Sequence, residues 1–404
     1  MQHPSTSASW GSNGPPRTTR LAAHPACCRC VFVRRCRPYR AHGKRQAVVF
    51  GSVAHGRAGL GPAPDLHSAL VRDSESHAGG SLAAAAPNEI PSMNTPPATL
   101  RRPAVGVIPL WRTLAFLASH PLNRGHIVRA FSRYLRWQLA IRLLPGAAVV
   151  PFVGSSKLLV RRGMTGATGN IYAGLHEPQD MAFAALCLRP GDVFVDVGAN
   201  VGAYTVLVTT FARAVAIAIE PNPQAMATLK MNLCLNRIVD QVECHTCAVG
   251  AGEEIARMTT DLDTMNHLVT NDTHGNEHLA QIPLRSLDQI LGNRSATLIK
   301  LDVEGYELPA LEGATRTLGA APLLAVVLEL NGSGARYRRT DQEVHELMCA
   351  RGFRPFAFGL FDRRLSPLQD WRHDVGNTLY VRDPAAVLER LASAPPLPVL
   401  HHWL

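Results

Sequence analysis

Acidic residues and glycines follow one another in the middle of this chain. Asp196 lies in the apolar run 193–197, and Gly198, Asn200 and Gly202 come soon after it. An apolar run followed by glycines predicts a buried parallel strand that ends in a tight turn beside a ligand. Dinucleotide-binding turns have the pattern G-x-G-x-x-G, whose second glycine lets the backbone approach the pyrophosphate. Asn200 takes that second position here, which argues against NAD or FAD and favours a ligand without phosphates.

A second acid, Glu220, follows the next apolar run and lies 24 residues beyond Asp196. In nucleotide folds an acidic residue at this distance binds the ribose diol, because one carboxylate can accept from two hydroxyl groups. Asp196 would accept from an amino group of the same ligand, directly or through water. S-adenosylmethionine (SAM) offers both groups without a phosphate. The predicted cofactor-binding residues are Asp196, Gly198, Asn200, Gly202 and Glu220.

A third group of charged residues, Lys300, Asp302 and Glu304, lies at the end of a later apolar run. If that strand stays extended, the three side chains alternate onto one face and converge on the ligand. Glu329 is at the end of the strand expected next, and we expect it close by. Clustered carboxylates suit a general base, or a magnesium site if the metal is octahedral. The simpler alternative is that Lys300 and Glu304 only pair with each other.

From about residue 171 onward, strand-like and helix-like segments alternate. The expected strands are 193–197, 215–219, 242–249, 298–301, 324–330, 355–358 and 378–381. The expected helices are 179–188, 203–212, 224–236, 308–318 and 341–350. This alternation predicts an α/β fold with a doubly wound, mostly parallel, seven-stranded sheet. Ligands of such sheets lie beyond the carboxyl ends of the strands, where all the acids named above fall.

The N-terminal part divides into a tail and a lead-in. Residues 1–92 are rich in Pro, Gly, Ala, Ser and Arg without periodicity, so we expect them to be disordered, or upstream of a true start at Met93. Residues 93–170 form a lead-in of helix and hairpin, with an amphipathic basic helix at 124–144. That helix packs on the domain or, alternatively, contacts a membrane surface or a partner. We expect the main domain to comprise residues 171–385 and a C-terminal tail to comprise residues 386–404.

The formal charge of +10 belongs mainly to the tail. Residues 1–92 carry 11 Lys or Arg against 4 Asp or Glu, whereas the other 312 residues carry 30 against 27. The folded part is therefore nearly neutral, and we expect no nucleic-acid partner. No run in the chain has transmembrane length.

Cysteine and histidine usage argues against a resident metal. The tail cysteines near residue 30 have no second cluster with finger spacing. Cys244 and Cys247 lie in a strand-like run, and no disulfide pattern is present, so we expect a cytoplasmic protein. The insertion 265–278 contains His267, His274 and His278. We expect these histidines to be polar filler, or part of a lid over the acceptor, and not metal ligands. His176, before the first helix of the domain, is a further candidate base.

Together these segments resemble the FkbM family of SAM-dependent methyltransferases, which have the Rossmann-like class I fold. The resemblance covers about residues 165–382, and its most specific part is Lys-x-Asp-x-Glu-Gly-x-Glu at 300–307. Asn232, Asn236 and the segment 376–381 also belong to it. It implies O-methylation, with SAM, of a hydroxyl on a glycan, a sugar or a polyketide-like molecule.

An alcohol is a poor nucleophile until a base removes its proton. We expect Asp302 or Glu304 to be that base, with Lys300 holding their orientation. The alternative function is a non-catalytic nucleoside-binding partner of a glycan or natural-product assembly system, and a nicotinamide dehydrogenase ranks third. The identity of the acceptor and the oligomeric state are left open.

Overall fold

The computed structural model describes residues 110–143, 146–161, 163–259, 266–269, 279–371 and 377–404. All of them belong to one unit, residues 92–404. The predicted tail 1–92 and the proposed start at Met93 lie outside the described residues. Among the described helices, none is both long enough and apolar enough to cross a membrane.

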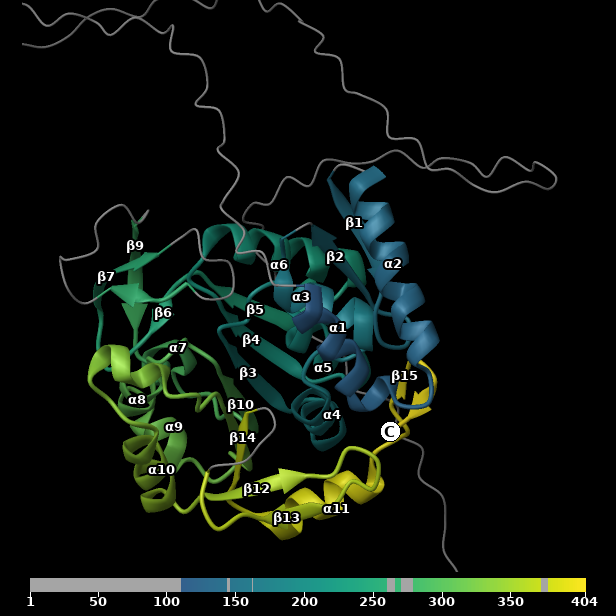
Figure 1. The fold of residues 1–404 in the computed structure, drawn as a ribbon. Coiled ribbons are helices and arrows are strands. Elements are labelled where there is room, and N and C mark those ends of the chain that lie inside the picture. Colours follow the sequence, from purple (N-terminus) through teal and green to yellow (C-terminus); the bar gives the residue numbers. More distant parts are fainter. Residues whose placement is uncertain (1–109, 144–145, 162, 260–265, 270–278, 372–376) are drawn as a thin grey trace, which may run out of the picture. The chain divides into compact units, whose positions relative to one another are not determined.

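An eight-stranded sheet forms the centre of this unit (Figure 1). Its strand order is β13-β12-β14-β11-β10-β3-β4-β5, and the five strands from β11 to β5 are parallel. The doubly wound, mostly parallel sheet is thus confirmed, with the short β13 added at one edge to the seven strands expected. The strands are β3 (Val193–Val197), β4 (Val215–Ile219), β5 (Val242–His245), β10 (Leu298–Leu301), β11 (Ala325–Leu328), β12 (Arg354–Phe358), β13 (Leu365–Pro367) and β14 (Thr378–Val381).

Successive residues of the central strands enter two different cores. Phe194 packs with α4 (Pro178–Cys187), α5 (Ala203–Phe211), α6 (Pro223–Asn236) and α11 (Pro384–Ser393). Val195 packs on the opposite face with α7 (Leu287–Leu291), α8 (Glu307–Glu312), α9 (Thr315–Gly319) and α10 (Asp341–Ala350). A strand covered on both faces must be apolar throughout, which explains the uninterrupted runs in the sequence.

The run 242–249 was expected to be one strand, but it forms two. β5 ends at His245, and β6 (Ala248–Val249) joins a second sheet of order β6-β9-β7-β8. The other strands of that sheet are β7 (Glu254–Thr259), β8 (Leu268–Val269) and β9 (Leu279–Arg285). Changing sheets needs a break in the pairing, and an apolar run does not reveal which neighbour each half will pair with.

The helix expected at 308–318 is also divided, into α8 and α9. Gly313 ends α8, and a Cβ atom built on it would lie 2.0 Å from the carbonyl oxygen of Gly250. The backbone of another loop therefore passes directly against this glycine. Only glycine leaves room for that contact, so the break has a tertiary cause.

The lead-in has the predicted helix and hairpin. α1 (Leu110–Ser119), the short η1 (Pro121–Asn123) and α2 (Ile127–Leu143) precede β1 (Ala147–Pro151), β2 (Lys157–Arg161) and α3 (Thr165–Ala173). The hairpin docks on α6 through two side-chain amides: Asn232 Oδ1 accepts from the Leu159 N–H at 2.7 Å, and Asn236 Oδ1 accepts from Lys157 at 2.8 Å.

The C-terminal residues, expected to be a tail, carry regular structure. α11 is followed by a hairpin of β15 (Pro398–Val399) and β16 (His402–Trp403). Val387, Leu391 and Leu397 are buried in the same core as α4 and α5. This end of the chain therefore packs on the domain.

Candidate active site

The glycine turn after β3 requires left-handed backbone at three positions. The φ angles are +77° at Gly198, +50° at Asn200 and +83° at Gly202. A Cβ atom on Gly198 would lie 1.9 Å from the carbonyl oxygen of Asp302, so a second loop occupies the space over this glycine. Gly198 is needed for its conformation and for this contact between protein loops.

Glu220 stands at the tip of β4 and braces that turn. Its two carboxylate oxygens accept from the backbone N–H of Asn200 and of Asn222, each at 2.8 Å. Burial raises the pKa of Glu220 to about 7, although the two hydrogen bonds act to lower it. Each oxygen keeps a second lone pair, so the carboxylate can still accept from hydroxyl donors.

Asp196 lies within β3 and is 1% exposed. Its Oδ2 accepts from the Thr205 backbone N–H at 3.1 Å and from the Thr205 hydroxyl at 2.6 Å. Its Oδ1 is buried and has no hydrogen-bond partner among the described residues. Burial raises the pKa of Asp196, and Lys300 opposes that shift. An orphaned buried acceptor of this kind calls for a donor from a ligand or water.

Lys300 comes next to Asp196 because β10 pairs in register with β3. Its ammonium forms an ion pair of 2.8 Å with Asp302 and lies 5.1 Å from the centre of the Tyr204 ring. Burial alone would lower the pKa of Lys300, but Asp302, Glu177 and Asp196 together raise it. Lys300 thus stays charged, and it pairs with Asp302 and not with Glu304, the partner in the simpler alternative.

The turn after β10 differs from the expected extended strand. β10 ends at Leu301, and Glu304 has left-handed backbone with φ +55°. Glu307 holds this turn, because its Oε1 accepts from the backbone N–H groups of Val303 at 3.2 Å and Gly305 at 3.1 Å. A Cβ on Gly305 would lie 2.5 Å from the Ser333 carbonyl, so the loops after β10 and β11 are packed together.

This tight turn brings three carboxylates together. One oxygen each of Asp302, Glu304 and Glu329 lie within 4.8 Å of one another. Burial and the neighbouring Asp302 raise the pKa of Glu304 to about 7 and also raise the pKa of Glu329. Burial acts to raise the pKa of Asp302 as well, but Lys300 lowers it below its ordinary value. At neutral pH, Asp302 is the ionised member, hydrogen-bonded to Glu329, and Glu304 titrates.

The same three oxygens are close enough to hold a divalent cation. Carboxylates are suitable ligands for Mg²⁺, which usually keeps several waters. General-base use and cation binding are therefore the two chemical uses open to this cluster.

Four residues that were not predicted as site residues line the same region. The Tyr204 hydroxyl donates to Glu177 at 2.7 Å, and the Asn377 amide approaches the other oxygen of Glu177 at 3.4 Å. The Asn377 backbone N–H donates to Asp180 at 3.2 Å. Burial and the nearby Glu177 raise the pKa of Asp180 to about 8. An acid on the otherwise apolar α4 was the available signal for Asp180.

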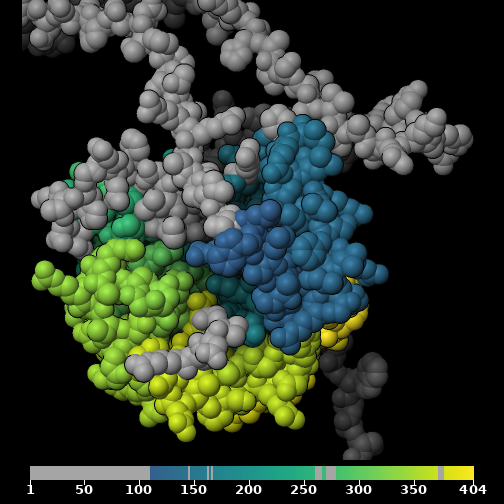
Figure 2. All heavy atoms as spheres, viewed as in Figure 1, coloured from purple at the N-terminus to yellow at the C-terminus, as the bar shows by residue number. Residues whose placement is uncertain are grey.

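His176 also belongs to this region, because it acts electrostatically to lower the pKa of Asp302. Its ring lies 5.6 Å from the ring of Phe116 on α1, and its Nδ1 is buried with no partner among the described residues. The N-terminal segment thus contacts His176. In Figure 2 this segment borders a hollow, with the green part of the chain on the other side. Of the insertion histidines, only His267 is described; His274 and His278 lie outside the described residues.

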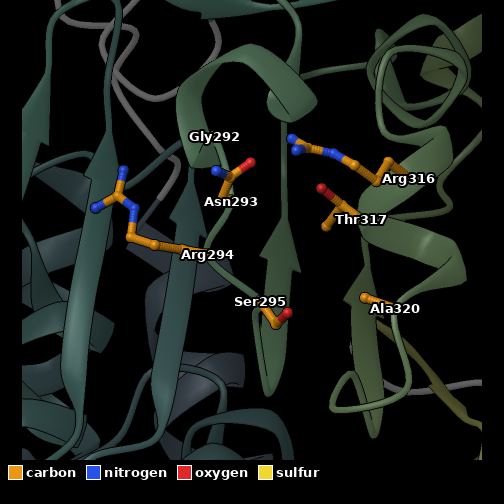
Figure 3. A pocket seen from close by; sticks show the side chains of 7 residues that line it. All are labelled: Gly292, Asn293, Arg294, Ser295, Arg316, Thr317 and Ala320. Atoms are coloured by element: carbon orange, nitrogen blue, oxygen red, sulfur yellow. The ribbon is translucent and has the colours of Figure 1, made fainter.

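A small pocket on another part of the domain does not belong to this site (Figure 3). It lies before β10, at the amino end of that strand, and contains Arg294 and Arg316. Arg294 is paired with Glu243, and Arg316 donates to the carbonyl of Asp288. Its two cations are therefore engaged within the protein.

Comparison with protein families matches residues 196–355 to the methyltransferase FkbM domain. The matched segment begins at Asp196 and contains the glycine turn, Glu220 and the three clustered carboxylates. The chain carries an FkbM methyltransferase domain. The matched family implies SAM as the cofactor. The orphaned Asp196 Oδ1 and the remaining lone pairs of Glu220 fit the amino and hydroxyl groups of that ligand.

Solved methyltransferases are similar to about half of this chain, at low identity and low TM-score. A precorrin-6y C5,15-methyltransferase from Geobacter metallireducens is 12% identical, with a TM-score of 0.29, over 51% of this chain and 86% of that chain. An rRNA methylase from Streptococcus thermophilus is 15% identical, with a TM-score of 0.29, over 50% and 91%. A Streptococcus mutans protein solved in complex with SAH is 12% identical, with a TM-score of 0.30, over 50% and 93%. The comparison with curated proteins gives no match.

Proposed function

We propose that this FkbM methyltransferase transfers a methyl group from SAM to a hydroxyl oxygen of a glycan, a sugar or a polyketide-like molecule. The observation that supports an oxygen acceptor is the convergence of Asp302, Glu304 and Glu329 at the ends of β10 and β11. A hydroxyl must lose its proton to react, and the cluster supplies proton acceptors beside the expected ligand cleft.

The binding half of the site consists of the glycine turn with Asp196 and Glu220. We assign Glu220 to the ribose hydroxyls and Asp196 Oδ1 to the amino group. Bound SAM supplies a methyl group already activated on a sulfonium. Because the electrophile needs no further activation, the protein has to align the acceptor, exclude water and take the proton.

We assign the proton transfer to Glu304, with Asp302 as the second candidate. Among the described residues, no ion pair holds the Glu304 carboxylate, and a base with a pKa near the working pH is efficient. Lys300 acts as a positioning residue, because its ammonium holds Asp302 at 2.8 Å. His176 remains a further candidate base.

We place this reaction in the cytoplasm. The support is that Cys187, Cys234, Cys244, Cys247 and Cys349 are all free thiols. Unpaired cysteines are the usual state in a reducing compartment. Fractionation of the native protein with markers for each compartment tests this assignment.

The reaction is tested with methyl-labelled SAM and the metabolite and glycan extract of the producing organism. We expect label in a product whose methyl group resists alkaline hydrolysis, as an ether does and an ester does not. Pre-methylated extract, with its hydroxyls blocked, is the matched control. Label on nitrogen or carbon would overturn the oxygen assignment, and SAM binding without any transfer would favour the non-catalytic nucleoside-binding alternative.

Treatment with EDTA separates the two uses of the carboxylate cluster. General-base catalysis predicts unchanged turnover after chelation and dialysis. Loss of turnover that Mg²⁺ restores would instead assign the three carboxylates to a cation.

A further inference from the structure

The outward face of α2 carries aliphatic side chains where a surface helix normally carries polar ones. Ala130 and Trp137 of this helix face the core and are buried. Four aliphatic residues on the opposite side expose more than half of their surface: Val128 80%, Leu135 63%, Leu139 60% and Leu143 68%. Their spacing of seven, four and four residues puts them in one stripe along the helix.

Arginines flank this stripe on both sides. The helical period puts Arg142 on one side of it and Arg129 and Arg136 on the other, and all three are exposed. Residues 110–143 contain six arginines and no Asp or Glu. The face is therefore apolar along its middle and positive along its edges, and segment 110–143 itself contains no acidic residue to offset the charge.

The helix is held rigidly in this orientation. The Arg133 guanidinium donates to the Tyr172 carbonyl at 2.9 Å and to Asn123 at 2.7 Å, and Gln138 donates to the Tyr172 hydroxyl at 3.1 Å. α2 lies at the margin of the described unit in Figure 1, in blue. The stripe is thus presented outward by a helix whose other side is committed to the core.

We propose that this face of α2 docks on the surface of a lipid bilayer that contains anionic lipids. The aliphatic stripe would enter the boundary between headgroups and acyl chains, as the apolar face of an interfacial helix does. The flanking arginines would extend alongside it to the lipid phosphates. A membrane surface fits better than an acidic protein, because the stripe is a single row on a convex helix with positive charge along both edges.

Vesicle flotation of the full chain tests this proposal. We expect the protein to float with phosphatidylcholine vesicles that contain phosphatidylserine, to float much less with phosphatidylcholine alone, and to be released by salt. The double variant Leu135→Gln/Leu139→Gln should lose flotation. The double variant Arg136→Gln/Arg142→Gln should lower vesicle affinity by about tenfold or more. Ile255→Gln, at a position 66% exposed on β7, is the matched control and should float normally.

Three results would overturn the proposal. The wild-type chain could fail to float with either vesicle. The α2 variants could float as well as wild type, which would assign the binding to other basic residues, such as those of 1–92. The leucine variant could instead convert a dimer to a monomer in sedimentation, which would make the stripe a contact between copies. Circular dichroism and thermal midpoints of all variants confirm that they are folded.

Discussion

Glu304 adopts a backbone conformation that few glutamates adopt. Its φ of +55° lies in the left-handed region, which costs a non-glycine residue of order 1 kcal/mol or more. The Glu307 carboxylate and the packing of Gly305 against Ser333 maintain it. The charged residues of the Lys-x-Asp-x-Glu-Gly-x-Glu element thus have three roles. Asp302 and Glu304 belong to the carboxylate cluster, Lys300 pairs with Asp302, and Glu307 holds the turn.

The variant Glu304→Gln should lose turnover while keeping SAM affinity. The amide preserves the shape but cannot accept a proton, and general-base catalysis contributes about 10²- to 10⁴-fold. In the wild type, turnover should rise with pH up to about 7, the pKa of Glu304, and then level off, because the base must be deprotonated. The variant should lack that rise. Steady-state kinetics against pH, with calorimetric SAM binding, measure both quantities.

A collapse of SAM affinity with normal turnover at saturation would contradict this role for Glu304. Glu312→Gln, on the exposed side of α8, is a suitable control that should change neither quantity.

The variant Glu220→Ala should act in the opposite way. It removes the acceptor proposed for the ribose hydroxyls and the brace on the Asn200 N–H, so SAM affinity should fall by about tenfold to a hundredfold. Turnover at saturating SAM should fall much less. Glu220→Gln keeps one carbonyl oxygen, so its SAM affinity should lie between those of the wild type and Glu220→Ala. Isothermal titration measures this series, and equal affinities across it would remove Glu220 from the binding site.

At the scale of elements, the uninterrupted apolar strands were predictable and the junctions were not. The parallel strands β3, β4 and β10 are buried on both faces, so each appears in the sequence as an apolar run. The split between β5 and β6 and the break between α8 and α9 depend on contacts with distant segments, which a local pattern does not contain. The carboxylates came together as expected, but through a tight turn and not through strand alternation.

The contact between Glu177 and Asn377 could not be predicted, because it also joins distant segments. They meet across 200 positions of sequence. The family resemblance included the segment around Asn377. It therefore marked this segment as part of the family pattern but did not identify Glu177 as the partner of Asn377.

The variant Gly198→Ala tests the contact between the loops after β3 and β10. Its methyl group would need the space of the Asp302 carbonyl, 1.9 Å away, in addition to the left-handed φ. We expect a loss of about 3 kcal/mol or more in the free energy of unfolding. Gly191→Ala, with φ +86° and no atom within 4 Å, isolates the conformational cost and should lose about 1 kcal/mol. Denaturant unfolding compares them, and equal losses would show that the contact has no energetic weight.

At the scale of the whole molecule, several buried acids act on stability together. The pKa values of Asp180, Glu220 and Glu307 are raised to about 8, 7 and 7, first by burial. A raised pKa adds stability below the unfolded value, near 4, and that contribution is lost as the pH rises through the folded value. The ligand-free domain should therefore become less stable between about pH 4 and pH 8.

The variant Asp180→Asn should reduce that loss. It keeps an oxygen to accept from the Asn377 N–H but cannot ionise. Relative to wild type it should gain about 2 kcal/mol or more at pH 8.5 and little at pH 5, because each pKa unit is worth about 1.4 kcal/mol. Denaturant unfolding at the two pH values measures the difference. A gain that is the same at both would contradict burial as the cause.

One amide side chain joins two parts of the chain that the sequence keeps far apart. Asn232 accepts from the Leu159 N–H of the hairpin and donates to the Val201 carbonyl of the glycine turn at 2.8 Å. Because linkage is reciprocal, a ligand that tightens the turn must make opening of this hairpin amide more costly. Deuterium uptake at Leu159 therefore reports occupancy of a cleft that the residue itself does not line.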